Sequence, residues 1–246
     1  MSPDEISQTL VLIKPDALKL SLTGYVLSQL SEFHTGLRFA AAKIVHVSRM
    51  LAEEHYAEHK GKYFYPPLIE YLMGRIHHRD MPLRRRVIAF VYSGPNAVAT
   101  VRKIAGPTIP HMARDTAPGT IRALGTVVPV KDETGKVIGE RMDNLIHASA
   151  TEEEAEREIK LWFEPKDIMP AMRKYATATC PEPFYLKDGR LLAVSEPGCA
   201  CFLAEGNLAW QSDLDALQLM KQGRPAPRSL DAVVAKYLIN EKLEEG

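Results

Sequence analysis

The stretch NLIHASATEEEAEREIKLWF, residues 144–163, places a short apolar run around Leu145 directly before a strongly patterned helix. Thr151 and Glu154 have the spacing of a capping box, which predicts that the helix begins beside His147 and does not contain it. At 3.6 residues per turn, four apolar side chains share one face of this helix: Ala155, Ile159, Trp162 and Phe163. The stretch therefore predicts a strand followed by a helix that packs on a sheet.

Glu158 lies at the edge of that apolar face, whereas Glu153, Arg157 and Lys160 are expected to face water. A carboxylate at an apolar edge loses hydration unless a hydrogen-bond donor offsets the loss, and His147 is the expected donor. An acid that orients an imidazole prepares a histidine nucleophile, and the nearby helix N-terminus disfavours imidazolium and suits a phosphate. From this stretch alone, a buffered loop histidine with an exposed glutamate is an equally open alternative.

Strand and helix patterns alternate through the preceding sequence. Strands are expected at residues 9–13, 39–47, 87–92 and near Leu145. Helices are expected at 23–33, 48–61, 68–73 and 95–104. Thr23 is the expected cap of the first helix and Phe33 ends its buried face, and the prolines between 105 and 122 predict a long ordered loop. This order favours an α+β fold, a ferredoxin-like antiparallel sheet sandwich with helices on the faces.

Two segments are expected to be insertions into that plan. Residues 74–86 contain Arg84-Arg85-Arg86, and residues 124–143 have the pattern of a β-hairpin around Asp132-Glu133-Thr134-Gly135. A triple-basic run is more often a solvated edge or a subunit contact than a phosphate patch. Both interpretations of the arginines stay open.

The sequence changes character after Phe163. Glycine turns separate short apolar runs, and helical patterns follow from Ser212 and from Ser229. We therefore expect a main domain at residues 1–170 and a small C-terminal α+β appendage of unknown role at residues 171–246.

Composition limits the partners. The 246 residues carry 31 Lys and Arg against 31 Asp and Glu, so no overall field attracts nucleic acid or an anionic membrane, and nucleic acid is not expected as a partner. The apolar runs, such as VIAFVY at 87–92, are far shorter than the ~20 residues that span a bilayer. The start MSPDEISQ lacks a secretory pattern, so we expect a cytoplasmic protein.

The three cysteines lie in the C-terminal third, at Cys180, Cys199 and Cys201. An odd number without further histidines after His147 favours structural thiols over a metal site.

The motif Asn144-x-x-His147-x-Ser149, followed by the helix up to Phe163, strongly resembles the active-site signature of the nucleoside diphosphate kinase family. Three other segments agree with that family in order and spacing: TLVLIKPDA (9–17), EEHYAEHKGKYFYPPL (53–68) and APGTIR (117–122). The resemblance runs from about Thr9 to Met169 and leaves the last third uncovered.

The resemblance implies ping-pong transfer of a γ-phosphoryl group between nucleoside tri- and diphosphates through phosphohistidine, with Mg²⁺ on the phosphates and no protein residue assigned to the metal. It implies catalytic roles for His147 as nucleophile and for Glu158, Lys14 and Ser149. It implies nucleotide binding by Lys14, Tyr56, Phe64, Arg102, Thr108, Arg122 and Asn144. Base stacking on Phe64 tolerates any base, which fits broad nucleotide specificity.

The residue types suit this chemistry because phosphoryl transfer needs positioning and positive charge on the phosphate oxygens. The sequence also departs from the family pattern: Leu20, Pro66-Pro67, Ala148, Ala150 and the hairpin at 124–143. The hairpin enters near a loop that many members use for subunit contacts, so we expect a homo-oligomer with altered assembly.

Two other functions compete with the kinase. One is a nucleotide-binding regulatory or interaction module on the same fold with incidental activity, and retention of the nucleophile argues against it. The other is nucleic-acid binding through Arg84 to Arg86, which the neutral overall charge disfavours.

Overall fold

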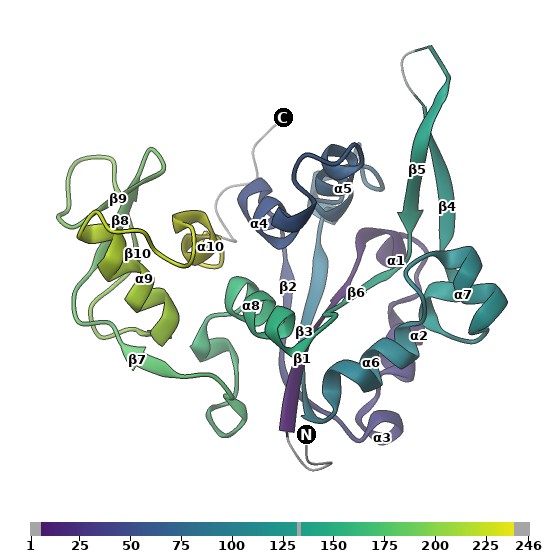
Figure 1. Cartoon of the computed structure of the whole chain (residues 1–246), viewed down its shortest axis with the longest axis horizontal. Helices are drawn as coiled ribbons and strands as arrows, with labels where there is room; N and C mark the ends of the chain where they lie inside the picture. Colours follow the sequence, from purple (N-terminus) through teal and green to yellow (C-terminus); the bar gives the residue numbers. More distant parts are fainter. Residues whose placement is uncertain (1–5, 132–133, 239–246) are drawn as a thin grey trace.

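The computed structural model describes residues 6–131 and 134–238, and its centre is a four-stranded antiparallel sheet. The strands are β1 (Ile6–Ile13), β2 (Arg38–Val45), β3 (Val87–Pro95) and β6 (Ile146–Ala148), in the order β2-β3-β1-β6. Together with the surrounding helices this is an α+β fold, as the sequence predicts (Figure 1).

Strand β1 is buried from Ser7 to Ile13 because helices cover both faces of the sheet. Leu10 and Leu12 point into one core with α4 (Arg49–His55) and α8 (Glu152–Trp162). The alternate residues of β1 join a second core with α2 (Thr23–Gln29) and α6 (Ala97–Ala105), on the other side of the sheet (Figure 1). Burial on both sides explains why TLVLI is a continuous apolar run and does not alternate.

Capping side chains start two helices, α4 and α8, where the sequence predicts. Ser48 accepts a hydrogen bond from the Leu51 N–H at 3.2 Å and begins α4. Thr151 accepts one from the Glu154 N–H at 3.1 Å and begins α8 just after His147. The prolines after Tyr65 occupy the first turn of α5 (Tyr65–Leu72), where a missing N–H costs no helical bond.

Several local expectations were wrong. The helix expected at 48–61 ends at His55, and a separate 3₁₀ turn, η1 (Ala57–His59), follows it. The helix expected at 23–33 ends at Gln29, its N-cap is Leu22, and Ser31 caps a new short helix, α3 (Glu32–Thr35), which leaves Phe33 96% exposed. The expected loop at 105–122 contains α7 (Pro110–Thr116), because Pro110 fits a first helical turn, and the 3₁₀ turn η3 (Ile121–Leu124). Lys160 is buried, because its ammonium lies 5.2 Å from the centre of the Tyr175 ring of the C-terminal segment.

The two expected insertions flank one corner of the molecule. Strands β4 (Thr126–Lys131) and β5 (Val137–Asp143) form a separate antiparallel hairpin that projects from the body (Figure 1), and Asp132 and Glu133 of its expected turn lie outside the described residues. The segment 74–86 folds as turns with one short 3₁₀ helix, η2 (Pro82–Arg84).

A short helix, α1 (Pro15–Lys19), follows β1 directly.

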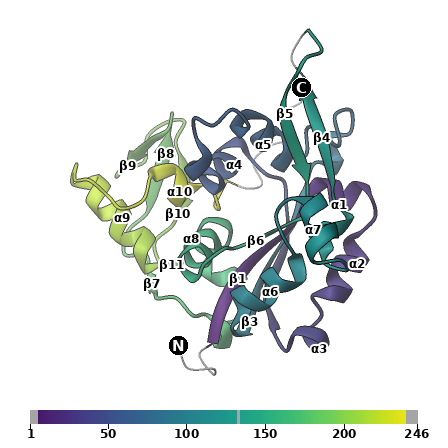
Figure 2. The same cartoon turned by 45° about the vertical axis from the view of Figure 1, so that its right-hand side comes forward.

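The C-terminal segment has its own small core, which includes Cys180, Phe184 and Leu217. Its elements are β7 (Thr177–Thr179), β8 (Phe184–Lys187), β9 (Arg190–Leu192), β10 (Ala200–Leu203), β11 (Leu208–Trp210), α9 (Gln211–Lys221) and α10 (Leu230–Val234). Figures 1 and 2 both place these elements beside α4 and α8. Trp210 is buried in the core on that side of the sheet, and its Nε1–H donates to the Phe163 carbonyl at 2.7 Å.

Two smaller findings bear on the sequence predictions. Cys180 is buried, Cys201 is exposed, and all three cysteines are free thiols. In the part of the chain that the structure describes, no helix combines the length and the apolar character needed to cross a membrane.

Candidate active site

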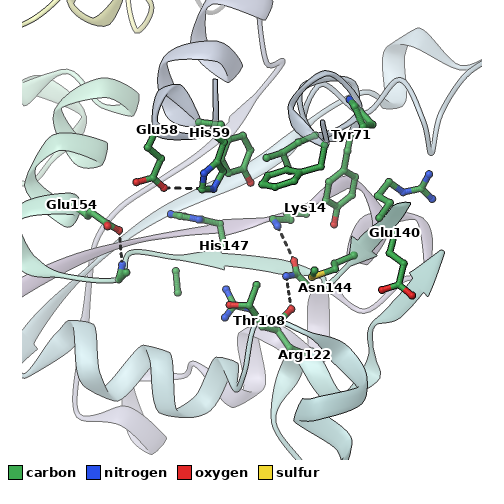
Figure 3. Close-up of a pocket in the computed structure, with 18 of the residues that line it drawn as sticks. Lys14, Glu58, His59, Tyr71, Thr108, Arg122, Glu140, Asn144, His147 and Glu154 are labelled. Atoms are coloured by element: carbon green, nitrogen blue, oxygen red, sulfur yellow. Dashed lines mark hydrogen bonds and ion pairs between the residues drawn. The ribbon is translucent and has the colours of Figure 1, made fainter. Parts of the chain in front are cut away.

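A cavity of about 400 Å³ lies between the end of β1, the α4–α5 region, the α6–α7 region and the two strands β5 and β6. The side chains that the sequence predicts to bind nucleotide and phosphate all line it: Lys14, Tyr56, Phe64, Arg102, Thr108, Arg122, Asn144 and His147. Figure 3 shows His147 on one side of this cavity and Glu140 on the other, with Lys14 and Asn144 between them. The two remaining predicted residues, Ser149 and Glu158, lie behind His147.

His147 is held by a buried carboxylate. It sits on β6, opposite Leu12 of β1, and its Nε2 lies 2.8 Å from Glu158 Oε2. The same oxygen accepts a bond of 2.6 Å from the Ser149 hydroxyl, and Glu158 is 2% exposed. Because an ionised carboxylate only accepts, the imidazole hydrogen belongs on Nε2 and the lone pair on Nδ1.

The surroundings keep this imidazole neutral. Burial is the main cause that lowers the pKa of His147 well below its usual value, and the nearby cations Lys14 and Arg122 add to it. A neutral ring with its lone pair on Nδ1 is a nucleophile at neutral pH.

His55 is a site residue that the sequence reasoning missed. Its ring centre lies 4.4 Å from that of His147 in an edge-to-face contact, and its Nδ1 accepts a hydrogen bond from the Trp162 Nε1–H at 3.2 Å. Burial, followed by the neighbouring His147, lowers the pKa of His55 well below its usual value. The available signal was helical spacing, because His55 follows the buried Leu51 and Ala52 on the same face of α4.

His55, His147 and Glu158 also bring their possible ligand atoms within 4.8 Å of one another. Hydrogen bonds already use this set, because Trp162 donates to His55 Nδ1 and both His147 and Ser149 bond to Glu158 Oε2. Mg²⁺ prefers oxygen ligands in octahedral geometry, so a nitrogen-rich cluster does not suit it. The cluster of His55, His147 and Glu158 is therefore not suited to a magnesium ion.

Lys14 is the first residue after β1 and the N-cap of α1, so the strand end aims it into the cavity. Its Nζ donates to Asn144 Oδ1 at 2.8 Å and lies 5.2 Å from the centre of the Tyr71 ring. Burial lowers the pKa of Lys14 to about 8, although Asp16 partly offsets the effect. The ammonium is therefore charged at neutral pH and loses its charge in mildly alkaline solution.

A strained turn at Leu145 sets the position of Asn144. Leu145 is fully buried with a φ of 70°, which is unusual for a bulky side chain. Its N–H donates to Asp16 Oδ2 at 2.9 Å, and its carbonyl accepts from the Lys14 N–H at 2.9 Å. Asn144 in turn donates from Nδ2 to the Thr108 carbonyl at 2.9 Å. Asp16, which the sequence reasoning also missed, thus connects the turn that carries Lys14 to the strand β6 that carries His147.

Arg102 of α6 and Arg122 of η3 provide positive charge at the cavity. Arg122 is 4% exposed and donates to the carbonyls of Gly106 at 3.0 Å and Ile146 at 3.3 Å. Burial and then Arg102 lower the pKa of Arg122 to about 10, so an anion here would relieve unfavourable charge. Gly106 has a φ of +82°, and a Cβ would meet Thr120 Oγ1 at 2.2 Å, so only glycine allows this packing.

The inserted hairpin forms one wall of the cavity, which sequence reasoning did not foresee. Glu140, Arg141 and Met142 of β5 line the cavity together with Tyr63 and Phe64 from the α4–α5 region. Gly139 lies against the Tyr63 ring so closely that a Cβ would come within 2.5 Å of it. No sequence pattern indicated this contact, because it depends on the direction in which the hairpin leaves the body.

The family model described as nucleoside diphosphate kinase matches residues 7–168. The nucleoside diphosphate kinase of Pyrococcus furiosus is 41% identical over 165 residues, which is 67% of this chain and 88% of that protein. The enzyme of Thermus thermophilus is 38% identical over 164 residues, 67% of this chain and 100% of that protein.

Two solved structures are similar to this chain. The nucleoside diphosphate kinase of Aquifex aeolicus has a TM-score of 0.53 and 29% identity, and the match covers 67% of this chain and 100% of that chain. A Borrelia burgdorferi nucleoside-diphosphate kinase with bound vanadate and ADP, described as a transition state mimic, has a TM-score of 0.51 and 31% identity over 69% of this chain and 94% of that one. By this match and these relatives, the chain belongs to the nucleoside diphosphate kinase family.

Proposed function

We propose that this protein is a nucleoside diphosphate kinase in which His147 carries the phosphoryl group. The observation that carries the proposal is the bond from His147 Nε2 to the buried Glu158, which leaves Nδ1 as the free nucleophilic nitrogen in a cavity lined by Lys14, Arg102 and Arg122. Nδ1 forms a bond to the γ-phosphorus of a nucleoside triphosphate while the bond to the β-phosphate oxygen breaks. The diphosphate leaves with that electron pair. A β-phosphate oxygen of a second diphosphate then attacks the phosphorus, and the bond from phosphorus to Nδ1 breaks, which returns its electron pair to His147.

The other side chains have supporting roles in this proposal. Lys14, Arg102 and Arg122 stabilise negative charge on the phosphate oxygens, because fixed cations in a site of low water content are effective there. Asn144, Thr108 and Tyr56 bind the sugar and the phosphates, and Phe64 stacks on the base. Glu158 and Ser149 orient the ring of His147 and keep its hydrogen on Nε2.

Mg²⁺ is the proposed cofactor, and it enters with the nucleotide. Bound to phosphate oxygens, the ion neutralises charge that develops on them during transfer. Of the carboxylates at the cavity wall, Glu58 pairs with His59 and Glu154 accepts from the Ala150 N–H, whereas Glu140 lies on the opposite side of the cavity (Figure 3), which supports binding by phosphates and water over binding by a protein cage.

The experiment that tests the proposal uses γ-labelled ATP and Mg²⁺ with the full chain. Wild-type protein should gain label that is stable in alkali and labile in acid, and addition of a different diphosphate should transfer the label to the new triphosphate. His147→Ala should abolish the label. His111→Ala is the matched control, because His111 is exposed on α7 and outside the cavity, and it should label like wild type.

Absence of label on wild-type protein that still binds nucleotide would contradict the proposal. The chain would then be a nucleotide-binding regulatory module, the competing function. Label that persists in His147→Ala would place the nucleophile elsewhere.

We also propose that the body of the protein is ferredoxin-like and forms one domain at residues 1–170. The strand order β2-β3-β1-β6 with antiparallel neighbours supports the fold type. The family match that ends at residue 168 and the separate core of the C-terminal segment support the division from residues 171–246.

Truncation after Arg173 tests the division. The removed segment buries Trp210 against Phe163, and Ser229 bonds to Glu54 of α4 at 2.9 Å. We therefore expect the fragment 1–173 to lose thermal stability and to bind an apolar dye, measured by thermal unfolding and dye fluorescence, since it exposes apolar surface. A fragment with wild-type stability would mean that the appendage is not needed to cover the body.

A homo-oligomer and a cytoplasmic location complete the proposal. Phe33 is 96% exposed and Ile44, on the edge strand β2, is 65% exposed, which supports contact with a second copy. Light scattering on the purified protein tests the assembly, and fractionation of cells tests the location.

A further inference from the structure

His55 lies directly against the proposed nucleophile, although it does not line the nucleotide cavity. It is the last residue of α4 and is 1% exposed. Its ring centre lies 4.4 Å from that of His147, with an angle of 79° between the two planes. This separation is at the short end of the range for aromatic rings in contact, so no water fits between the two imidazoles. One side of the nucleophile is therefore covered by a second imidazole.

His55 is itself held in place by α8. Its Nδ1 accepts a hydrogen bond from the Trp162 Nε1–H at 3.2 Å, and Trp162 is fully buried. Arg157 of the same helix donates from Nη2 to the His55 carbonyl at 3.4 Å. The end of α4 is thus bonded to α8 through both a side chain and the backbone. A ring held in this way is a fixed support for its neighbour.

The hydrogen bonds of His55 do not account for a histidine at this position. Burial lowers the pKa of His55 well below its usual value, so the ring is neutral, and its hydrogen lies on Nε2 because Nδ1 accepts from the indole. In the part of the chain that the structure describes, this Nε2 has no hydrogen-bond partner. Burying a donor without a partner is unfavourable, and such groups are rare in native proteins. An acceptor for Trp162 does not require an aromatic ring, so that bond alone does not explain why an imidazole is present.

The bond between His147 and Glu158 leaves the tilt of the His147 ring loosely set. It holds Nε2 at 2.8 Å from Glu158 Oε2, but a hydrogen bond tolerates moderate changes of angle. The lone pair of Nδ1 lies in the plane of the ring, and it must point at the γ-phosphorus for the new bond to form. The tilt of the ring therefore affects the chemical step, and a second contact is needed to fix it.

We propose that His55 is a positioning residue for phosphoryl transfer, which sets the tilt of the His147 ring by direct contact and so aims the Nδ1 lone pair at the phosphorus. This inference rests on the proposed function, in which His147 is the nucleophile. Because His55 is absent from the cavity lining, its loss should slow the chemical step and leave nucleotide binding nearly unchanged. Its Nδ1 accepts from Trp162 and lies 3.9 Å from Glu158 Oε1, so the negative charge of Glu158 stays available to His147.

The test measures phosphorylation of the full chain by labelled ATP and Mg²⁺ in a rapid-quench experiment. It gives the rate constant at saturating ATP and the ATP concentration for half-saturation. The label at completion counts the folded active sites, so unfolded protein does not enter the rate constant. In His55→Asn, an amide oxygen can still accept from Trp162, but the ring contact is lost. We expect the rate constant to fall about tenfold, because misaligned reacting groups slow a chemical step, while half-saturation changes by less than about twofold.

His55→Phe is the variant that should restore the rate. It places a flat ring beside His147 again and removes the acceptor of the Trp162 N–H. We expect a rate constant within about threefold of wild type, with lower thermal stability because a buried N–H is left unpaired.

Leu51→Ala is the control for stability alone. Leu51 is fully buried about one turn earlier on α4 and does not line the cavity. This variant should unfold at a lower temperature, because it leaves a space in the core, and should keep the wild-type rate constant.

Three results would overturn the inference. One is a wild-type rate constant in His55→Asn, and another is a change in half-saturation with no change in rate constant. The third is an equal fall of the rate constant in His55→Phe or Leu51→Ala, which would mean that His55 acts only through the stability of the core. If neither His55 variant folds, NMR relaxation of labelled histidine rings in the wild-type chain decides, because a mobile His147 ring would contradict the inference and a rigid one would support it. Wild-type protein that gains no label would instead contradict the proposed function itself.

Discussion

The two ends of the nucleotide cavity are built differently. At the His147 end, Glu158 and Ser149 are buried, and each polar group there bonds to the next. At the other end, the hairpin strand β5 contributes Glu140 and Arg141, which are exposed or partly exposed (Figure 3). The comparison indicates that buried, hydrogen-bonded side chains hold His147 in place. The inserted hairpin instead provides the side chains that face the part of a nucleotide farther from His147.

Among the variants that test this comparison, Glu158→Gln should have the largest effect on the transfer rate. In Glu158→Gln, the amide oxygen can still accept from His147 and Ser149, but the negative charge that strengthens these bonds is lost, and the amide NH₂ replaces an oxygen that lies 3.5 Å from Arg157 Nη2, so the ring is oriented less firmly. We expect the transfer rate to fall about 10-fold or more, since bonds to a charged partner contribute roughly 1.5–3 kcal/mol. Stopped-flow measurement of phosphorylation checks this. Glu153→Gln on the exposed side of the same helix is the control, and a wild-type rate in Glu158→Gln would mean that this carboxylate does not orient the histidine.

The second effect is the dependence of kcat/KM on pH. It concerns Lys14, which lies between the two ends of the cavity (Figure 3). The pKa of His147 is lowered by burial, so the nucleophile stays neutral as pH falls through 6.5 and no loss is expected there. The pKa of Lys14 is lowered to about 8, so its charge is present below pH 8 and is lost as pH rises through that value. We expect kcat/KM to be flat near neutrality and to fall above pH 8.

Lys14→Arg provides the control for that profile, because an arginine keeps its charge throughout. Its rate should be lower near neutral pH, and its alkaline fall should disappear. A fall at pH 8 that persists in this variant would assign the titration to another group.

The smallest expected effect is at the hairpin end. In the wild type, the bonds from His77 and Arg141 hold the pKa of Asp143 at about 2, although burial raises it. In His77→Leu, Asp143 loses one of these two partners. We expect the KM for nucleotide to rise about threefold with kcat unchanged, because one hydrogen bond contributes roughly 0.5–1.5 kcal/mol. His77→Gln keeps a donor near the same place and should restore the wild-type KM. A fall in kcat with no change in KM would mean that the two ends are not separate in function.

Local patterns in the sequence were enough for the strands of the sheet and for the caps at Ser48 and Thr151. These features depend on periodicity and capping, which act between near neighbours. The roles of His147, Lys14 and Arg122 came from the family resemblance, and they stay predictions until they are measured.

The features that could not be predicted depend on contacts between distant segments. Lys160 has the position of an exposed helical residue, but the C-terminal segment covers it. Phe33 has the spacing of a buried residue, but Ser31 ends the pattern by capping a new helix. The wall formed by Glu140 and Arg141 depends on the direction of the hairpin, which no local pattern encodes.

The nitrogen that carries phosphate tests the central claim most directly. Wild-type protein is phosphorylated with ATP and Mg²⁺, and the site of the bond on the imidazole is determined by phosphorus and nitrogen NMR. Because Nε2 is 2.8 Å from Glu158, the phosphorus should be bonded to Nδ1 of His147. Phosphate on Nε2, or on any other residue, would contradict the account.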